Sequence, residues 1–317
     1  MTIDQQEMEV KMEGVTAGTK PGLSFNRVLR MSVVALALCL FSRFAAAAEL
    51  TWTGCGITKK AFMVEIAKVY KEKTGIKIRI SGGGATRGIR YVSAGYSDMG
   101  GSCRHRLFDL TGAIHEEERD TKLIRVAWDA LVAVVHKDNP VNNISLDNLK
   151  KVYEGKITSW KDLGGKDKRI VLLVRDGKYS GVGHMFRWLV FNDPEYGFKA
   201  RALIFKSTAP LEKKIEKTLT AFGVTGISSA KKERLKVLSL DGVTPTKENI
   251  ASGKYPLFRP IYITVKKDST NPEIKRFIDF ILSPEGQAEI SAQGTVNLSE
   301  GEALIPLWEE KKATLGF

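Results

Sequence analysis

Two short glycine-rich segments, each placed where a strand-like run meets a helix-like run, constrain this chain most. The first covers residues 53–58, Thr-Gly-Cys-Gly-Ile-Thr, and the second covers 81–88, Ser-Gly-Gly-Gly-Ala-Thr-Arg-Gly. A third turn, Gly-Gly-Ser-Cys-Arg at 100–104, closes the strand that follows. Glycine lets the backbone approach a ligand closely, and a helix that begins there points free N–H groups outward. Where such segments meet at the carboxyl ends of parallel strands, they predict a site for an oxyanion.

The rest of the chain alternates strand-like and helix-like runs. Isoleucines at 76, 78 and 80 alternate with Lys77 and Arg79, which predicts a half-buried strand, and the apolar run 126–136 predicts a buried one. Further strands are predicted at 50–53, 97–101, 170–174, 221–228, 237–240 and 261–265, and helices at 58–75, 86–94, 148–153, 183–191, 272–282 and 284–293. Thr58 is expected to cap the first helix. This order predicts an α/β fold with mainly parallel sheets in two lobes, which the chain crosses near 128–138 and 254–264.

Residues 1–48 are predicted to be a secretory signal peptide. Arg27 and Arg30 precede the apolar run 31–40, and an alanine-rich stretch ends just before Glu49. A basic flank, a short apolar core and small residues at the cleavage site are typical of such signals. An uncleaved membrane anchor is the alternative, although the apolar run is short for a membrane span and Arg43 interrupts its continuation toward the alanine-rich stretch. We therefore expect a periplasmic protein whose mature chain begins at Glu49.

The chain is basic. Its formal net charge is +13, of which +12 remains without residues 1–48, because these hold five basic and four acidic side chains. Such a balance attracts anions without identifying them. Nucleic acid is the rival partner, but the basic residues are scattered among acidic ones and no arginine-rich run is present, so we expect no nucleic-acid binding.

Several segments together carry a family resemblance: 50–56, 82–88, Ser-Asp-Met-Gly-Gly-Ser-Cys-Arg at 97–104, Val-Tyr-Glu-Gly-Lys-Ile-Thr-Ser-Trp at 152–160, Arg175 leading to 180–181, 241–246, 255–257 and Ser-Pro-Glu-Gly-Gln at 283–287. With them, the chain resembles the substrate-binding proteins of phosphate-type ABC transporters, in the type 2 periplasmic binding protein superfamily. The resemblance implies an α/β fold with a cleft between two lobes, one formed by 49–131 plus 260–317 and the other by 132–259.

The resemblance also implies a site in which backbone N–H groups and hydroxyls of both lobes clamp an anion. On this chain those positions are Ile57, Thr58, Ala85, Thr86, Ser102, Cys103, Arg104, Arg175, Ser180, Gly181 and Val182. An oxyanion stripped of water needs many fixed donors, and charge-assisted hydrogen bonds are the strong ones. The Arg175 guanidinium would contribute a planar fork, with an interlobe salt bridge as the alternative role. Ser180 is expected to be the N-cap of its helix.

Three positions depart from the family pattern. Phosphate binders of this kind usually place a carboxylate at the position of Cys103, a serine at Ala85 and a threonine at Val182. The carboxylate accepts a proton from phosphate and rejects fully ionised anions. Without it, we expect weaker discrimination between phosphate and sulfate. The ligand is therefore expected to be phosphate or a related tetrahedral oxoanion, and Arg104 would add charge to the site.

Cys55 and Cys103 are the two cysteines of the expected mature chain. Both lie on turns that should converge, and an exported protein meets an oxidising compartment, so a disulfide between them is predicted. A metal site that includes His105 is an alternative, although the spacing matches no standard zinc pattern. A catalytic pair of Cys103 and His105 is a further alternative, disfavoured because such near neighbours in a loop seldom orient as nucleophile and base.

The sequence thus predicts a solute-binding protein that captures an anion and delivers it to the permease of an ABC transporter by closing its lobes. We expect no cofactor, no metal and a monomer. Two alternatives remain: an oxoanion sensor that docks on a signalling partner, and an enzyme on the same scaffold. No nucleophile–base–orienter set and no paired carboxylates with metal spacing support the enzyme, so a non-catalytic role is expected.

Overall fold

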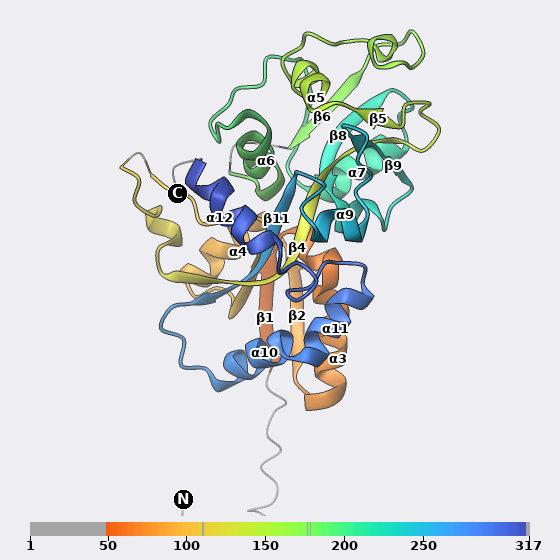
Figure 1. The fold of residues 1–317 in the computed structure, drawn as a ribbon. Coiled ribbons are helices and arrows are strands. Elements are labelled where there is room, and N and C mark those ends of the chain that lie inside the picture. Colours follow the sequence, from red (N-terminus) through yellow and green to blue (C-terminus); the bar gives the residue numbers. More distant parts are fainter. Residues whose placement is uncertain (1–48, 110, 176, 178, 315–317) are drawn as a thin grey trace, which may run out of the picture. The chain divides into compact units, whose positions relative to one another are not determined.

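The computed structural model describes residues 49–314, with the exception of residues 110, 176 and 178 (Figure 1). The predicted signal peptide, 1–48, lies outside the described residues. Within them, no helix is both long enough and apolar enough to span a membrane. The described residues belong to one compact unit.

The strands are β1 Glu49–Gly54, β2 Lys77–Gly82, β3 Met99–Ser102, β4 Thr121–His136, β5 Asn143–Ile144, β6 Val171–Arg175, β7 Leu203–Phe205, β8 Ala221–Gly226, β9 Leu235–Val237, β10 Ser239–Leu240 and β11 Phe258–Lys266. The α-helices are α2 Gly56–Thr58, α3 Val64–Thr74, α4 Gly84–Ser93, α5 Leu146–Tyr153, α6 Gly181–Phe186, α7 Thr208–Glu216, α8 Ile227–Ala230, α9 Lys247–Ala251, α10 Pro272–Leu282, α11 Pro284–Ala292 and α12 Leu304–Thr314. Lys59–Met63 and Arg187–Phe191 are π-helical, and Glu116–Glu118 and Trp160–Leu163 are 3₁₀-helical.

Nine of the described strands form one large sheet in the order β2-β1-β3-β11-β4-β8-β6-β7, with β9 also paired to β4, and β5 and β10 form a separate two-stranded parallel sheet. The pairs β1–β2 and β1–β3 are parallel at one end of this order, and β6–β7 and β6–β8 are parallel at the other. Between them, β4 and β11 run antiparallel to each other (Figure 1). Parallel ends of this kind require helical crossovers, and α3, α4, α6 and α7 provide them.

The long strand β4 connects the two parallel groups, which we call the first lobe (β1–β3) and the second lobe (β6–β8). Its residues up to Ala130 pair with β11, whereas Leu131 onward pairs with β8. The pairing partner therefore changes between Ala130 and Leu131, one residue before the predicted boundary of 131 and 132. The predicted assignment of 49–131 plus 260–317 to one lobe and 132–259 to the other stays a prediction.

The expected N-cap of the first helix, Thr58, is wrong by three residues. The helix begins at Gly56, and its N-cap is Cys55, whose sulfur accepts a hydrogen bond from the N–H of Thr58 at 3.3 Å. Thr58 itself is buried inside the first turn. The predicted end at Gly75 is confirmed: this residue has a φ of 74°, the left-handed conformation that glycine adopts without steric cost.

The glycines of the predicted loops have a packing role that the sequence did not reveal. The indole of Trp52 is fully buried, and a Cβ atom at Gly54 or Gly101 would overlap with it. A Cβ at Gly88 would lie 2.8 Å from the carbonyl oxygen of Thr53, so this glycine lets α4 pack directly on β1. These residues therefore hold the carboxyl ends of β1 and β3 and the helix α4 close together, which positions the three loops around one point.

Candidate functional site

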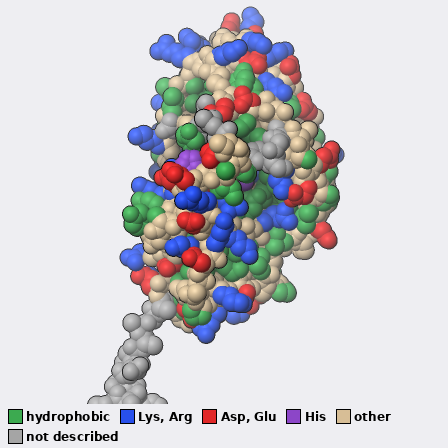
Figure 2. Space-filling model, turned by 90° about the vertical axis from the view of Figure 1, so that its left-hand side faces the viewer, with side chains coloured by type: hydrophobic (Ala, Val, Ile, Leu, Met, Phe, Trp, Pro, Cys, Tyr) green, Lys and Arg blue, Asp and Glu red, His purple; other side chains and the backbone are tan. Residues whose placement is uncertain are grey.

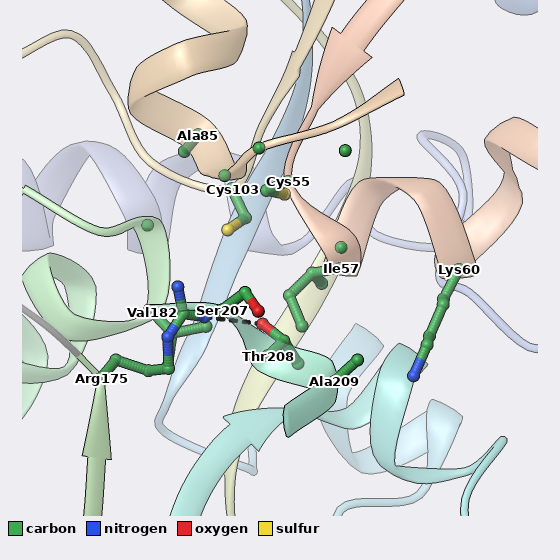
Figure 3. A pocket seen from close by; sticks show the side chains of 15 residues that line it. Cys55, Ile57, Lys60, Ala85, Cys103, Arg175, Val182, Ser207, Thr208 and Ala209 are labelled. Carbon is green, nitrogen blue, oxygen red and sulfur yellow. Dashed lines mark hydrogen bonds between the residues drawn. The ribbon is translucent and has the colours of Figure 1, made fainter. Parts of the chain in front are cut away.

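A cavity of about 240 Å³ lies where the three predicted loops meet two helices of the second lobe (Figure 3). Its walls come from the carboxyl ends of β1, β2 and β3 and from the beginnings of α6 and α7. The lining residues are Cys55, Gly56, Ile57, Lys60, Gly82, Gly83, Gly84, Ala85, Cys103, Arg175, Gly181, Val182, Ser207, Thr208 and Ala209. We call this cavity the interlobe pocket.

Six of the residues expected in the site line the interlobe pocket: Ile57, Ala85, Cys103, Arg175, Gly181 and Val182. Five do not: Thr58, Thr86, Ser102, Arg104 and Ser180. Sequence reasoning missed Lys60 and the start of α7, which is formed by Ser207, Thr208 and Ala209. The segment at the start of α7 carries no glycine-rich junction, but a serine directly before a helix is a recognisable N-terminal signal.

Two helices present uncapped N-termini to the pocket. Neither Gly83 before α4 nor Ser207 before α7 makes a side-chain capping hydrogen bond. Gly83 and Gly84 have φ values of 148° and 89°, so the chain turns sharply into α4 in a conformation that other residues rarely adopt. Free N–H groups and the positive ends of the two helix dipoles thus lie at the pocket, an arrangement suited to an anion.

Arg175 ends β6 and is the guanidinium that lines the pocket (Figure 3). It donates hydrogen bonds to Thr208 Oγ1 at 2.7 Å, to the carbonyl of Phe205 at 3.2 Å and to that of Lys206 at 3.0 Å. Burial lowers its pKa below the usual value for arginine. No carboxylate hydrogen-bonds to this side chain in the described structure, so its charge is held at the start of α7 without a neutralising partner of its own.

Arg104 is placed differently from the expectation. It is fully buried and pairs with the buried carboxylate of Glu118 through hydrogen bonds of 2.7 and 2.9 Å. Its other donors contact the carbonyls of His105 and Tyr179 and the hydroxyl of Thr86. Burial by itself would raise the pKa of Glu118, but the Arg104 guanidinium outweighs it and lowers this pKa. The positive charge of Arg104 is therefore compensated, and its donors are used within the protein.

The hydroxyls expected to bind the anion also have partners in the protein. Ser180 is the N-cap of α6, as predicted, and its Oγ accepts from the N–H of Gly183 at 3.0 Å. Ser102 Oγ donates to the carbonyl of Arg104 at 2.7 Å, which fixes the turn after β3. Thr86 Oγ1 donates to the carbonyl of Tyr179 at 2.7 Å. This last hydrogen bond joins α4 of the first lobe to the loop before α6.

A buried ion pair that the sequence did not reveal lies next to the pocket, and its arginine contacts both lobes. Arg259 donates to Asp129 at 3.0 Å, and both side chains are fully buried. Its other terminal nitrogen donates to the carbonyls of Cys103 at 3.2 Å and Gly181 at 3.3 Å, one in each wall of the pocket. Lys60 makes a second connection, because it reaches from the first helix to Glu212 of α7 at 2.9 Å.

The comparisons with known proteins agree with this geometry. A family model described as the PBP superfamily domain matches residues 53–285. The chain belongs to the PBP superfamily. Phosphate-binding protein PstS of Bacillus subtilis is 30% identical over 259 residues, which cover 80% of this chain and 82% of that protein. A PstS of Borreliella burgdorferi is 31% identical over 197 residues, which cover 60% of this chain and 70% of that protein.

Solved structures agree as well. A phosphate ABC transporter substrate-binding protein from Clostridium perfringens, solved with bound phosphate, is 28% identical and superposes with a TM-score of 0.68 over 78% of this chain and 99% of that one. An ABC-type phosphate transport receptor from Vibrio cholerae is 27% identical, with a TM-score of 0.59 over 78% and 99% of the two chains. The predicted resemblance to phosphate-type substrate-binding proteins and the predicted two-lobe α/β fold are confirmed.

This PBP superfamily member carries two free thiols at the pocket, so the predicted disulfide is not found. Cys55 and Cys103 are both buried and unbridged, and both line the interlobe pocket. The reason is the capping role of Cys55, whose sulfur turns toward Thr58 and contacts its hydroxyl at 2.9 Å. Burial alone would raise the pKa of Cys55, but the hydrogen bonds from Cys103 and Thr58 outweigh it and lower this pKa to about 6.

The metal alternative has no support in the same region. Among the described residues, no group of three or more His, Cys, Asp and Glu side chains could hold a metal ion. The His105 ring contacts His184, with 3.3 Å between their Nε2 atoms.

Charged side chains of both signs are interspersed on the molecular face drawn in Figure 2, as expected from the scattered basic residues of the sequence.

Proposed function

We propose that this protein is an extracytoplasmic binding protein that captures phosphate, or a related tetrahedral oxoanion, in the interlobe pocket. The observation that carries the proposal is the meeting of Arg175 with the uncapped N-termini of α4 and α7 in one cavity. The names of the B. subtilis and B. burgdorferi relatives, which describe phosphate-binding proteins, support phosphate as the first ligand to test.

The binding cycle consists of closure of the lobes around the anion. Thr86 and Arg104 contact the Tyr179 carbonyl, and Lys60 contacts Glu212, so polar contacts hold the walls together in this structure. A ligand that touches both walls favours the closed form by its difference in affinity for the two forms. The closed protein then presents its ligand to the permease subunits of an ABC transporter. The chain acts as a periplasmic monomer after removal of residues 1–48, without a cofactor and without catalysis.

The test is calorimetric titration of the chain from Glu49 with phosphate, sulfate, molybdate, tungstate and phosphonates. Arg175→Ala removes the pocket guanidinium, and hydrogen bonds to charged groups contribute about 1.5–3 kcal/mol, so phosphate affinity should fall about 10- to 100-fold. Arg276→Ala is the control, because this exposed side chain on α10 pairs with Glu273 and lies outside the pocket lining. Unchanged phosphate affinity in Arg175→Ala would remove Arg175 from the site, and no binding of any tested anion by the unmodified protein would refute the proposal.

A further inference from the structure

The interlobe pocket contains two thiols, each at the end of one of two neighbouring strands. Cys55 follows β1 and Cys103 follows β3, two adjacent parallel strands in which Gly54 is paired with Gly101. The N–H of Cys55 donates to the carbonyl of Gly101 at 3.0 Å, which fixes one turn against the other. The two side chains lie side by side on the wall of the pocket (Figure 3). Two thiol side chains are thus held on neighbouring strand ends that face a ligand-sized cavity.

The surroundings make this pair nucleophilic. The sulfur of Cys55 accepts from the N–H of Thr58 at the N-terminus of a helix and contacts the hydroxyl of the same residue. The pKa of Cys55 is lowered to about 6, so at neutral pH this thiol is largely a thiolate, while the pKa of Cys103 is raised, first by its hydrogen bond to Cys55 and then by burial. The pair therefore carries one negative charge and one proton, and the thiolate is the reactive form of cysteine.

We propose that Cys55 and Cys103 chelate trivalent arsenic, taken up as neutral arsenous acid, in the interlobe pocket. Each sulfur displaces one hydroxyl group from arsenic and forms an arsenic–sulfur bond. The two departing hydroxides leave as water, one with the proton of the Cys103 thiol and one with a proton from solvent. Arsenic stays trivalent, no electrons are transferred, and one hydroxyl remains on it. The N–H groups of α4 and α7 are available to hydrogen-bond that hydroxyl.

The charges around the sulfurs select this ligand over thiophilic metal cations. Arg175 lines the same pocket, and Arg259 donates to the backbone carbonyl of Cys103. Two helix N-termini add positive potential. A divalent cation would meet this field without a third protein ligand, since the described residues contain no cluster of three metal-binding side chains. Arsenous acid is neutral, and with three hydroxyl groups it has dimensions similar to those of the oxoanions for which the pocket is proposed.

The experiment titrates the chain from Glu49, which lacks Cys39, with sodium arsenite under reducing conditions. Binding is followed by calorimetry and native mass spectrometry. The unmodified protein should gain the mass of one arsenous acid less two waters. This mass change requires two arsenic–sulfur bonds, and it can be measured without any variant. Cys55→Ser and Cys103→Ser should each weaken arsenite binding at least about 100-fold, because the second bond of a chelate forms at high effective concentration. Arg276→Ala, the exposed control on α10 outside the pocket lining, leaves both sulfurs and should bind arsenite like the unmodified protein.

The same preparations are titrated with phosphate, so that the two proposals can fail separately. Phosphate binding without arsenite binding would overturn the inference of arsenic chelation and leave the proposed function standing. Arsenite binding without phosphate binding would refute phosphate as the ligand of the proposed function and leave the inference of arsenic chelation standing. Full arsenite affinity in either single serine variant would also overturn chelation, because one thiol would then suffice. Displacement of bound arsenic by excess phosphate is expected, since both ligands would occupy the interlobe pocket.

Discussion

Gly181 is the residue at which closure of the pocket can be tested without removing any group that binds a ligand. It begins α6 in the second lobe, and a Cβ atom there would lie 2.5 Å from Cys103 Sγ and 3.0 Å from Ala85 Cβ, both in the first lobe. The substitution Gly181→Ala therefore places a methyl group between the two walls. Overpacking of this size costs about 1–3 kcal/mol, and opening of the lobes relieves it. We expect phosphate affinity to fall about 5- to 150-fold, because only the closed form pays this cost.

The assay is calorimetric titration with phosphate, accompanied by small-angle scattering of the ligand-free protein. Gly181→Ala should bind less tightly and have a larger radius of gyration, with a melting temperature close to that of the unmodified protein. Gly197→Ala is the matched control, because a Cβ there meets no atom within 4 Å. The double variant Gly181→Ala with Cys103→Ala removes the sulfur from the contact, so it should bind phosphate nearly as tightly as Cys103→Ala alone. Unchanged affinity in Gly181→Ala, or a loss that Cys103→Ala does not reduce, would refute this account of closure.

Two further predictions concern stability. Glu118→Gln leaves the buried Arg104 guanidinium without its carboxylate and should destabilise the fold by about 3–5 kcal/mol in denaturant titration, whereas the same change at exposed Glu285 should have little effect. Because the pKa of Cys55 falls from 9.0 in the free thiol to about 6 in the fold, its contribution to stability is complete above pH 9 and is lost as the pH falls to about 6. The difference in unfolding free energy between the unmodified protein and Cys55→Ser should thus grow from pH 6 to pH 9, and a constant difference would contradict the lowered pKa.

The order of strands and helices could be predicted from the sequence because it rests on local patterns. Alternating isoleucines mark β2, and proline at the first helical position together with a serine or asparagine cap marks α10 and α11. The purpose of the glycines could not be read in this way. Gly54 and Gly101 leave room for the ring of Trp52, and nothing in the local sequence says that this indole lies beneath both turns.

The charged partners could not be predicted because they are far apart in the chain. Arg259 lies 130 residues from Asp129, and Lys60 lies 152 residues from Glu212. A resemblance aligns the residues of a motif but does not say which cations already have a carboxylate. Arg104 looked like a ligand for this reason, although Glu118 neutralises it. The place of Arg175 in the pocket lining could be predicted from the resemblance, because that motif puts the residue at the end of a strand.

These assignments change what the replacement of a carboxylate by Cys103 means for selectivity. From the sequence, the loss of that carboxylate implied the loss of both a proton acceptor and a repulsive charge. The structure provides another source of both, because Cys55 lines the same pocket and its lowered pKa of about 6 leaves this thiol negatively charged at neutral pH. A sulfur anion beside the pocket can accept the proton of hydrogen phosphate and repel sulfate, which has no proton to give. Selectivity for phosphate would then rise with pH as Cys55 ionises, whereas a carboxylate would hold it constant over the same range. The two cysteines thus act together, and the chemistry of the site belongs to the pair and not to Cys103 alone.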